Sequence, residues 1–278
     1  MTVYGVGMSE RDVAAGIDTT RMHPARRYDY YLGGKDNFEA DRANAEMLAR
    51  VFPAAKVTAQ ENRRFLRRAV HMLAAEGGIR QFLDIGTGLP TQPNVHEIAQ
   101  GVDPASRVVY VDNDPIVLAH ARALLTSSPE GATAYVDADL REPEKILADP
   151  AVTGTLDLNR PVALMLVAIM HFITDDMDPY GIVARLVEAM PAGSYLVMSN
   201  GTLDLLPVAE ADGLRAAFAR SGEPAAPRTR AQFARFFHGL ELLPPGIVPV
   251  SQWRAGDEPG PRPAPAEAAV YAAVARKR

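Results

Sequence analysis

Gln81-Phe-Leu-Asp-Ile-Gly-Thr-Gly-Leu-Pro-Thr-Gln-Pro93 is the stretch that decides the fold. Its short apolar run ends on Asp84, and two glycines, Gly86 and Gly88, follow at alternate positions. The pattern then becomes helical over residues 93–99. A strand, a glycine turn and a helix in this order open a nucleotide-binding α/β unit. Glycines suit the turn because the backbone must bend sharply, often with positive φ, and a ligand must approach without a Cβ in its way.

The chain beyond residue 80 alternates regularly between strand-like and helix-like segments. The pattern predicts further strands over 108–111, 134–136, 161–170 and 194–198, and helices over 115–125, 141–148, 178–190, 205–221 and 230–238. Two last strands, 240–249 and 268–275, are joined without a helix, so they must run antiparallel. We therefore expect an α/β fold with a Rossmann-like, mostly parallel sheet of seven strands, the last of them antiparallel.

The segment before residue 80 is predicted to form helices joined by a tight turn. Pro24 suits the first turn of a short helix and Gly33 its left-handed exit. A second helix, capped near Asp36 or Asn37, covers 40–51, and a third covers 58–76. We expect residues 1–79 to form a lead-in and a helical cap, and residues 80–278 to form the ligand-binding domain.

The third of these helices carries a cluster of arginines, and their positions are Arg63, Arg64, Arg67 and Arg68. Such a run is most often a solvated face, which is the interpretation we favour over a phosphate or carboxylate site.

Composition excludes several classes of function. The net charge is −5, so no overall field favours a polyanion, and we expect no nucleic-acid partner. The chain has no cysteine, which excludes disulfides, thiolate metal sites and cysteine nucleophiles. No apolar run approaches the roughly 20 residues of a membrane span, and no signal peptide is evident, so we expect a cytoplasmic protein without a membrane partner. We also expect no metal site, and the pattern leaves the oligomeric state open.

Polar residues follow four consecutive predicted strands, and these residues are Asp84, Asp112, Asp139 and His171. Ligands of open parallel sheets bind at the carboxyl ends of the strands, so all four should lie along one edge. Asp112 comes 24 residues after Gly88, the place of the acid that binds a ribose diol. Asp139 with the Leu140 amide suits an adenine edge, and Asp84 suits an ammonium group. Any one of these acids alone would more often be a turn or cap residue.

The end of the glycine turn indicates which nucleotide is bound. A dinucleotide fingerprint needs a third glycine, where this chain has Thr91, and Pro90 and Pro93 remove amides from the start of the helix. A pyrophosphate site, and with it a nicotinamide-dependent dehydrogenase, is therefore disfavoured. The pattern suits a ligand with adenosine and no phosphate, such as S-adenosylmethionine.

The successive motifs resemble those of class I S-adenosylmethionine-dependent methyltransferases. They are Asp84-Ile-Gly-Thr-Gly88, Val109-Tyr-Val-Asp112-Asn113, Asp137-Ala-Asp139-Leu140 and the strand into His171. The segment Pro24-Ala-Arg through Leu32-Gly-Gly-Lys-Asp-Asn37, the run from Phe82 to Thr91 and the last strand with Tyr271 are similar, more narrowly, to the DUF574 group of predicted S-adenosyl methyltransferases. That similarity spans nearly the full chain.

The resemblance implies S-adenosylmethionine as cofactor and a set of residues that bind it. The glycine turn would lie under the methionine part, Asp84 near its amino group, Asp112 at the ribose, and Asn113 beside the adenine. The expected cofactor-binding residues are Asp84, Gly86, Thr87, Gly88, Asp112, Asn113, Asp139 and Leu140.

The acceptor side is less well defined by the sequence. His171 is placed to act as a general base, although a histidine after a buried strand is commonly a structural hydrogen-bonding group. The fourth strand lacks an Asn-Pro-Pro-Tyr tetrad, which leaves an unidentified small molecule as acceptor, through O or N. We expect the cap to close over the carboxyl edge and to bind the acceptor with Phe172; the expected residues are Tyr28, Tyr31, Gly34, Lys35, Asn37 and Phe172. The alternative is a sensor that binds the cofactor or its demethylated product without turnover.

Overall fold

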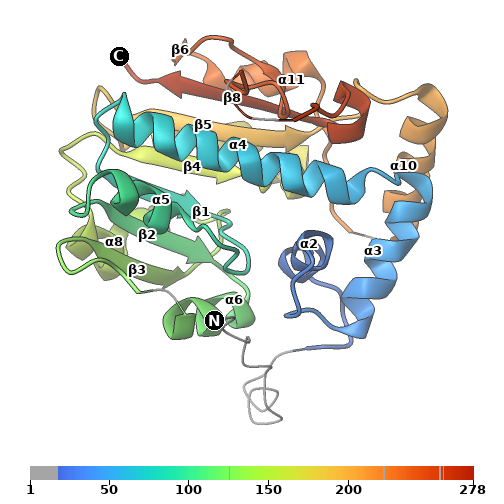
Figure 1. Ribbon diagram of the computed structural model, residues 1–278, viewed down its shortest axis with the longest axis horizontal. Helices are drawn as coiled ribbons and strands as arrows, with labels where there is room; N and C mark the ends of the chain where they lie inside the picture. Colours follow the sequence, from blue (N-terminus) through green and yellow to red (C-terminus); the bar gives the residue numbers. More distant parts are fainter. Residues whose placement is uncertain (1–17, 125, 222, 257, 259) are drawn as a thin grey trace.

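The computed structural model describes residues 18–278 except 125, 222, 257 and 259. In this part of the chain eight strands form one sheet in the order β3-β2-β1-β4-β5-β8-β6, and β7 also pairs with β8 (Figure 1). The strands are β1 Gln81–Ile85, β2 Arg107–Asp112, β3 Ala132–Asp137, β4 Ala163–Val167, β5 Tyr195–Gly201, β6 Glu241–Leu242, β7 Val248–Pro249 and β8 Val270–Arg276.

Strands β1 to β5 are parallel, and β8 runs antiparallel beside β5. The expected Rossmann-like sheet with its antiparallel closing strand is confirmed. The strand predicted over 240–249 is wrong in one respect, because it is split into β6 and β7. Pro244 and Pro245 carry no amide hydrogen for the sheet, and Gly246 turns the chain with a φ of 80°.

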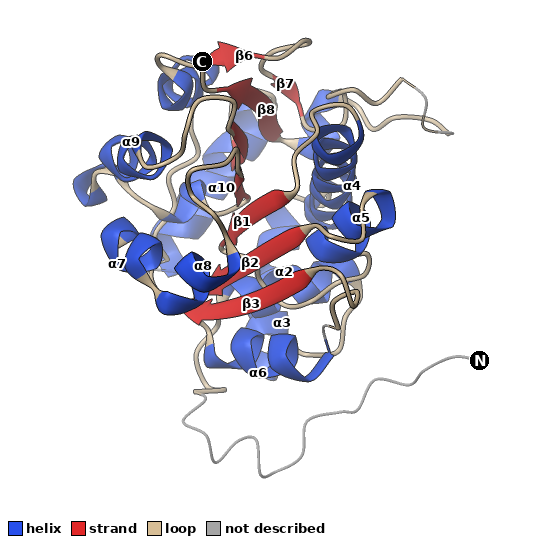
Figure 2. Ribbon diagram, turned by 90° about the vertical axis from the view of Figure 1, so that its left-hand side faces the viewer, coloured by secondary structure: helices blue, strands red, loops and turns tan. Residues whose placement is uncertain are grey.

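Helices cover both faces of the sheet. Figure 2 shows α4 and α5 on one side and α7, α8 and α9 on the other. Strands β1 and β4 are buried along their whole length, and β4 is the continuous apolar run expected of a central parallel strand. The helices are α2 Pro24–Leu32, α3 Glu39–Val51, α4 Ala55–Ala75, α5 Val95–Val102, α6 Pro115–Leu124, α7 Pro143–Ala148, α8 Pro150–Thr155, α9 Pro179–Glu188, α10 Val208–Ser221 and α11 Arg230–Ala234.

The turn between α2 and α3 differs in part from the prediction. Gly33 ends α2 in the left-handed region with a φ of 81°, as expected. The cap of α3, however, is Phe38 and not Asp36 or Asn37, because the Asp41 carboxylate accepts the Phe38 amide hydrogen at 2.8 Å. Helix α8 has no counterpart among the predicted elements. The lead-in expected before the cap lies, over residues 1–17, outside the described part of the chain.

The predicted solvated arginine face on α4 is wrong for two of its four members. Arg64 and Arg67 are exposed, but Arg63 donates to the Thr91 and Pro93 carbonyls of the loop after the glycine turn. Arg68 is largely buried and donates to the Trp253 and Val250 carbonyls. Arg63 and Arg68 instead bind the backbone of two loops and hold these loops against α4.

The cap lies past the carboxyl ends of the parallel strands. In Figure 1 helices α2, α3 and α10 stand on the side toward which the arrowheads of β1 to β5 point. Asp114, just after β2, holds α2 there: its carboxylate lies 3.2 Å from Arg26 Nε and 3.0 Å from His23 Nδ1. Both Arg26 and Asp114 are buried. The N-terminal helices are therefore fixed to the sheet by a buried ion pair and packing.

Removing Arg26 tests this anchor. Arg26→Ala should lower the free energy of unfolding by about 3 kcal/mol, because the Asp114 carboxylate stays buried with one positive partner fewer. The control is Arg215→Ala, which breaks an exposed pair with Asp212 and should cost less than about 0.5 kcal/mol. Urea unfolding of both variants gives the comparison, and equal losses would contradict a fixed cap.

Gly86 and Gly88 provide a matched pair for the glycine turn. Both have positive φ, 74° and 67°. A Cβ on Gly86 would lie 2.6 Å from Ile169 Cγ1, whereas the nearest atom to a Cβ on Gly88 is Ala25 Cβ at 4.0 Å. Gly86→Ala should therefore destabilise the protein by about 2 kcal/mol more than Gly88→Ala, since only the first adds a clash to the backbone strain. Chemical denaturation measures the difference, and equal stabilities would show that the turn can shift.

Candidate active site

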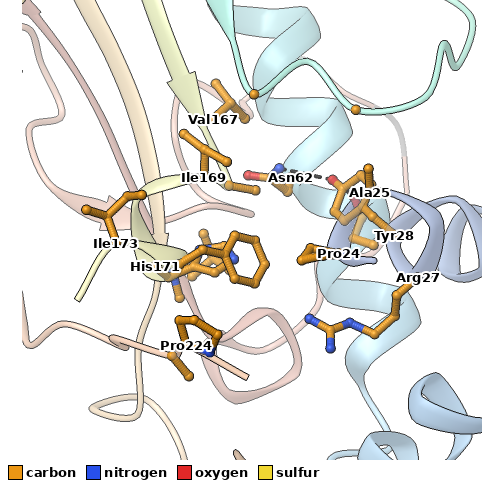
Figure 3. Close-up of a pocket in the computed structure, with 18 of the residues that line it drawn as sticks. Pro24, Ala25, Arg27, Tyr28, Asn62, Val167, Ile169, His171, Ile173 and Pro224 are labelled. Atoms are coloured by element: carbon orange, nitrogen blue, oxygen red, sulfur yellow. Dashed lines mark hydrogen bonds between the residues drawn. The ribbon is translucent and has the colours of Figure 1, made fainter. Parts of the chain in front are cut away.

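A cavity of about 470 Å³ opens at the carboxyl ends of the parallel strands, under the cap. This volume is in the range of sites for small ligands. The glycine turn and the ends of β2, β3, β4 and β5 line one part of it, and α2, α3, α4 and α10 line the rest. Figure 3 shows residues of α2 facing Ile169, His171 and Ile173 across the opening.

The glycine turn is held by the acid at the end of β2. One carboxylate oxygen of Asp112 accepts the Gly88 amide hydrogen at 2.8 Å, and the other accepts that of Asp114 at 3.0 Å. Burial raises the pKa of Asp112, while these two amides oppose the shift. Each carboxylate oxygen has a second lone pair, so Asp112 can still accept hydrogen bonds from a diol in the cavity.

Asp84 lies at the end of β1 beside this turn and is 5% exposed. Burial raises its pKa to about 7, and the nearby Arg63 charge and the Thr87 hydroxyl oppose that rise only in part. The Thr87 hydroxyl also donates to the Asp84 backbone carbonyl at 3.0 Å. A buried acid poised near neutrality is suited to a cationic ligand group, which would favour its ionised form.

Asp139 and Asn113, which follow β3 and β2, form a more exposed rim of this edge. The Asp139 carboxylate is paired with Arg141, whose Nε lies 2.9 Å from it, and the Asn113 amide approaches it at 3.4 Å. The hydrogen bond from Arg141 lowers the pKa of Asp139. Leu140 is buried and lines the cavity next to them.

His171 faces the cavity from a 3-10 turn, η1 Met170–Phe172, that follows β4. Burial, with the charges of Arg27 and Arg228, lowers its pKa to about 3. Its Nδ1 accepts the Gly201 amide hydrogen at 3.4 Å, which assigns the proton to Nε2. A neutral ring with this tautomer is a hydrogen-bond donor toward the cavity and a poor general base.

A buried cation holds the turn that carries His171 in place. Arg228 is 2% exposed and donates to the Met170 and Ile173 carbonyls at 2.6 and 2.7 Å. Just before the turn, Ala168 adopts a φ of 59°, and its amide donates to the Ser199 hydroxyl at 2.9 Å. Backbone strain of this kind is retained only where surrounding contacts impose it.

A chain of buried hydrogen bonds joins that strand end to the cap. The Ser199 hydroxyl donates to Asn62 Oδ1 at 2.6 Å, and Asn62 Nδ2 donates to the Tyr28 hydroxyl at 3.0 Å, the bond dashed in Figure 3. The Tyr28 hydroxyl in turn donates to the Ala59 carbonyl. The chain crosses from β5 through α4 to α2. It sets the distance between the cap and the His171 turn.

The predicted substrate residues separate into two groups. Tyr28, Tyr31 and Phe172 line the cavity. Gly34, Lys35 and Asn37 do not: Lys35 is exposed, and Asn37 donates to Asp29 Oδ2 at 2.8 Å within the turn between α2 and α3. The structure places these three in the turn between α2 and α3, outside the cavity lining.

Several lining residues were not predicted from the sequence. Arg27 and His23 flank the cavity from the cap motif, and Arg63 does so from the arginine run. Their motifs were visible in the sequence, but not which side chains turn inward. The remaining residues are apolar and come from separate helices and loops; among them are Leu48, Phe52, Leu66, Leu214, Phe218 and Val270.

The described residues include neither a candidate metal site nor a helix that could cross a membrane. They contain no group of three or more histidine, aspartate or glutamate side chains that could hold a metal ion. Asp178, the residue before α9, caps that helix by accepting the Gly181 amide hydrogen at 3.0 Å. No described helix has the length and apolar character needed to cross a membrane.

Comparison with known proteins identifies the family. A family model described as S-adenosyl methyltransferase matches residues 10–278. A DUF574 family protein from Streptomyces avermitilis is 50% identical, with a TM-score of 0.88 over 94% of this chain and 99% of that one. A provisionally assigned methyltransferase from Thermobifida fusca is 44% identical, with a TM-score of 0.86 over 95% and 98%. No curated protein sequence matches significantly.

The cavity fits the cofactor that this family uses. The turn at Gly86 leaves no room for a Cβ, and Asp84 is a buried acid beside it. Asp112 stands where the ribose acid of a nucleotide fold is expected. Fold, site and sequence agree, and the chain belongs to the S-adenosylmethionine-dependent methyltransferase family, in the DUF574 group.

Proposed function

We propose that the protein transfers a methyl group from S-adenosylmethionine to the oxygen or nitrogen of a small molecule, and that both ligands share the cavity. The observation that carries the proposal is the continuity of this cavity. It joins an acidic, glycine-bearing edge, suited to the cofactor, to an apolar chamber under the cap. The cap encloses the chamber, which favours a small acceptor over a macromolecule.

In this proposal each acid of the cofactor edge binds a different part of the cofactor. Asp112 would accept hydrogen bonds from the ribose hydroxyls while its bonds to the Gly88 and Asp114 amides keep it in place. Asp84 would face the amino group. Asp139, held by Arg141, and the Leu140 backbone would bound the adenine, with Asn113 beside it.

The residues on the acceptor side would contribute mainly by positioning the acceptor atom. When bound, the cofactor supplies an electrophilic methyl group on a sulfonium, and its in-line transfer leaves the bonding electron pair on sulfur. His171 Nε2–H would orient the acceptor atom by donating a hydrogen bond to it. Because the pKa of this ring is about 3, the proton released by the acceptor would pass to solvent and not be retained by His171.

A sensor that binds the cofactor without turnover is the second candidate. The low basicity of His171 is the observation that favours it. Release of S-adenosylhomocysteine across a library of small metabolites distinguishes the two: the proposal expects acceptor-dependent release, and a sensor gives none.

Asp112 tests the assignment of the cofactor edge. Asp112→Ala should weaken S-adenosylmethionine binding at least about 10-fold, because a charge-assisted pair of hydrogen bonds is lost. Asp212→Ala, which removes an exposed acid on α10, is the control and should leave the affinity unchanged. Calorimetric titration measures both, and NAD should not bind to the wild type. Unchanged affinity in Asp112→Ala would overturn the ribose assignment.

The raised pKa of Asp84 predicts how stability and cofactor binding depend on pH. Its pKa of about 7 lies above that of the unfolded chain, so its ionisation costs stability as pH rises from about 4 to about 7. Asp84→Asn should remove that decline and raise the stability of the free protein above pH 7. If the cofactor ammonium pairs with Asp84, binding near pH 7 should release roughly half a proton in the wild type and none in Asp84→Asn. Calorimetry in buffers of different ionisation enthalpy counts the protons, and equal release in both proteins would exclude the pairing.

A further inference from the structure

The apolar chamber lies on the far side of the cavity from the acids. Its walls come from α3, α4, α10 and the start of β8, and the lining side chains include Leu48, Phe52, Leu66, Leu214, Phe218 and Val270. Most of these are buried, with Leu48 6% and Phe52 8% exposed. Two phenylalanines, with Phe172 and Tyr31 nearby, give the chamber flat aromatic surfaces. Transfer of apolar area into it is favourable.

The charged group nearest this chamber is already neutralised inside the protein. Arg27 forms a two-point ion pair with Glu223, whose Oε1 lies 2.7 Å from Nη2, and Arg27 Nη1 also donates to Asn44 Oδ1 at 2.8 Å. Both charged side chains are less than a tenth exposed. A carboxylate ligand at the guanidinium would have to compete with Glu223 for its charge.

The polar groups around the chamber are also committed to the protein. The Tyr31 hydroxyl donates to the Ala45 carbonyl at 3.2 Å, and the Thr58 hydroxyl donates to the Glu267 carbonyl at 3.3 Å. The Tyr28 hydroxyl is held between Asn62 and Ala59. The other charged side chains that line the cavity, among them Asp84, Asp112 and Arg141, belong to the cofactor edge. An ionised ligand group moved from water into the chamber would therefore depend on the already paired Arg27 and Glu223 for a charged partner, which makes its transfer costly.

His171 supplies a neutral hydrogen-bond donor to the cavity. It lines the cavity, Figure 3 shows its side chain pointing into the opening opposite α2, and with Nδ1 accepting from Gly201 the ring nitrogen left to donate is Nε2. A neutral donor of this kind suits a hydroxyl or an uncharged amine. It offers little to a carboxylate that has lost its hydration.

We infer that the methyl acceptor is an uncharged, compact molecule with an apolar, ring-bearing body and one hydroxyl or neutral amine, seated in the chamber with that group at His171. This inference rests on the proposed methyl transfer and adds the chemical class of the acceptor. The rival is an acidic acceptor that displaces Glu223 from Arg27.

Matched probes separate these two classes of acceptor. We expect 4-propylphenol and 4-propylaniline to bind the protein loaded with S-adenosylhomocysteine at pH 7.5 at least about 10-fold more tightly than 4-propylbenzoate, which differs from the phenol mainly in charge. Calorimetry on the loaded wild type gives the three affinities. Tighter binding of the benzoate, lost in Arg27→Gln, would overturn the inference and establish the acidic acceptor.

A pair of variants on α10 tests the location. Phe218 lines the chamber, whereas Val208 on the same helix is 77% exposed and lies outside it. Phe218→Glu should weaken 4-propylphenol binding at least about 10-fold and leave S-adenosylhomocysteine binding within about twofold, and Val208→Glu should change neither. If the wild type binds S-adenosylhomocysteine but not the phenol, the acceptor class is wrong. If it does not bind S-adenosylhomocysteine, the proposed function itself fails.

Discussion

The turn after β2 is the constraint on which the rest of the site depends. It carries two acids, Asp112 and Asp114, which bind different parts of the structure. Asp112 reaches back to the Gly88 amide and fixes the glycine turn, while Asp114 reaches out to Arg26 and His23 and fixes the cap. The Asp114 carboxylate also accepts the Ile116 amide hydrogen and so begins α6. One short segment thus positions both the glycine turn and the cap, which bound the cavity.

Buried acids at such an edge carry a cost that a cationic ligand can offset. Burial raises the pKa values of Asp84 and Asp112 in the free protein, so the sheet end resists ionisation of both groups. The cofactor of this family brings an ammonium and a sulfonium, both positive. With the cofactor bound at this edge as proposed, binding and ionisation of the two acids would favour each other. The free energy that burial of these acids costs the free protein would then contribute to cofactor affinity.

The sheet could be predicted from the sequence far better than the acceptor chamber could. Strands such as β4 are continuous apolar runs, and Asp84, Asp112 and Asp139 each end one, so local pattern alone places them along one edge. The chamber has no such local signal, because Leu48, Leu214 and Val270 meet only through tertiary packing. The same limit explains why Lys35 and Asn37, predicted for the acceptor site, lie outside the cavity lining. Their motif marked a real turn, but which of its side chains face inward depends on how α2 docks.

The two consecutive arginines of α2 show how cofactor edge and chamber are joined. Arg26 pairs with Asp114 beside the cofactor edge, and Arg27 pairs with Glu223 in the segment after α10, beside the chamber. Neighbouring residues on a helix point about 100° apart, so one helix can hold both walls at once. A displacement of α2 would therefore alter the cofactor edge and the chamber together. The cap is thus an integral wall of the cavity, and in the proposed function cofactor and acceptor would be bound by one connected structure.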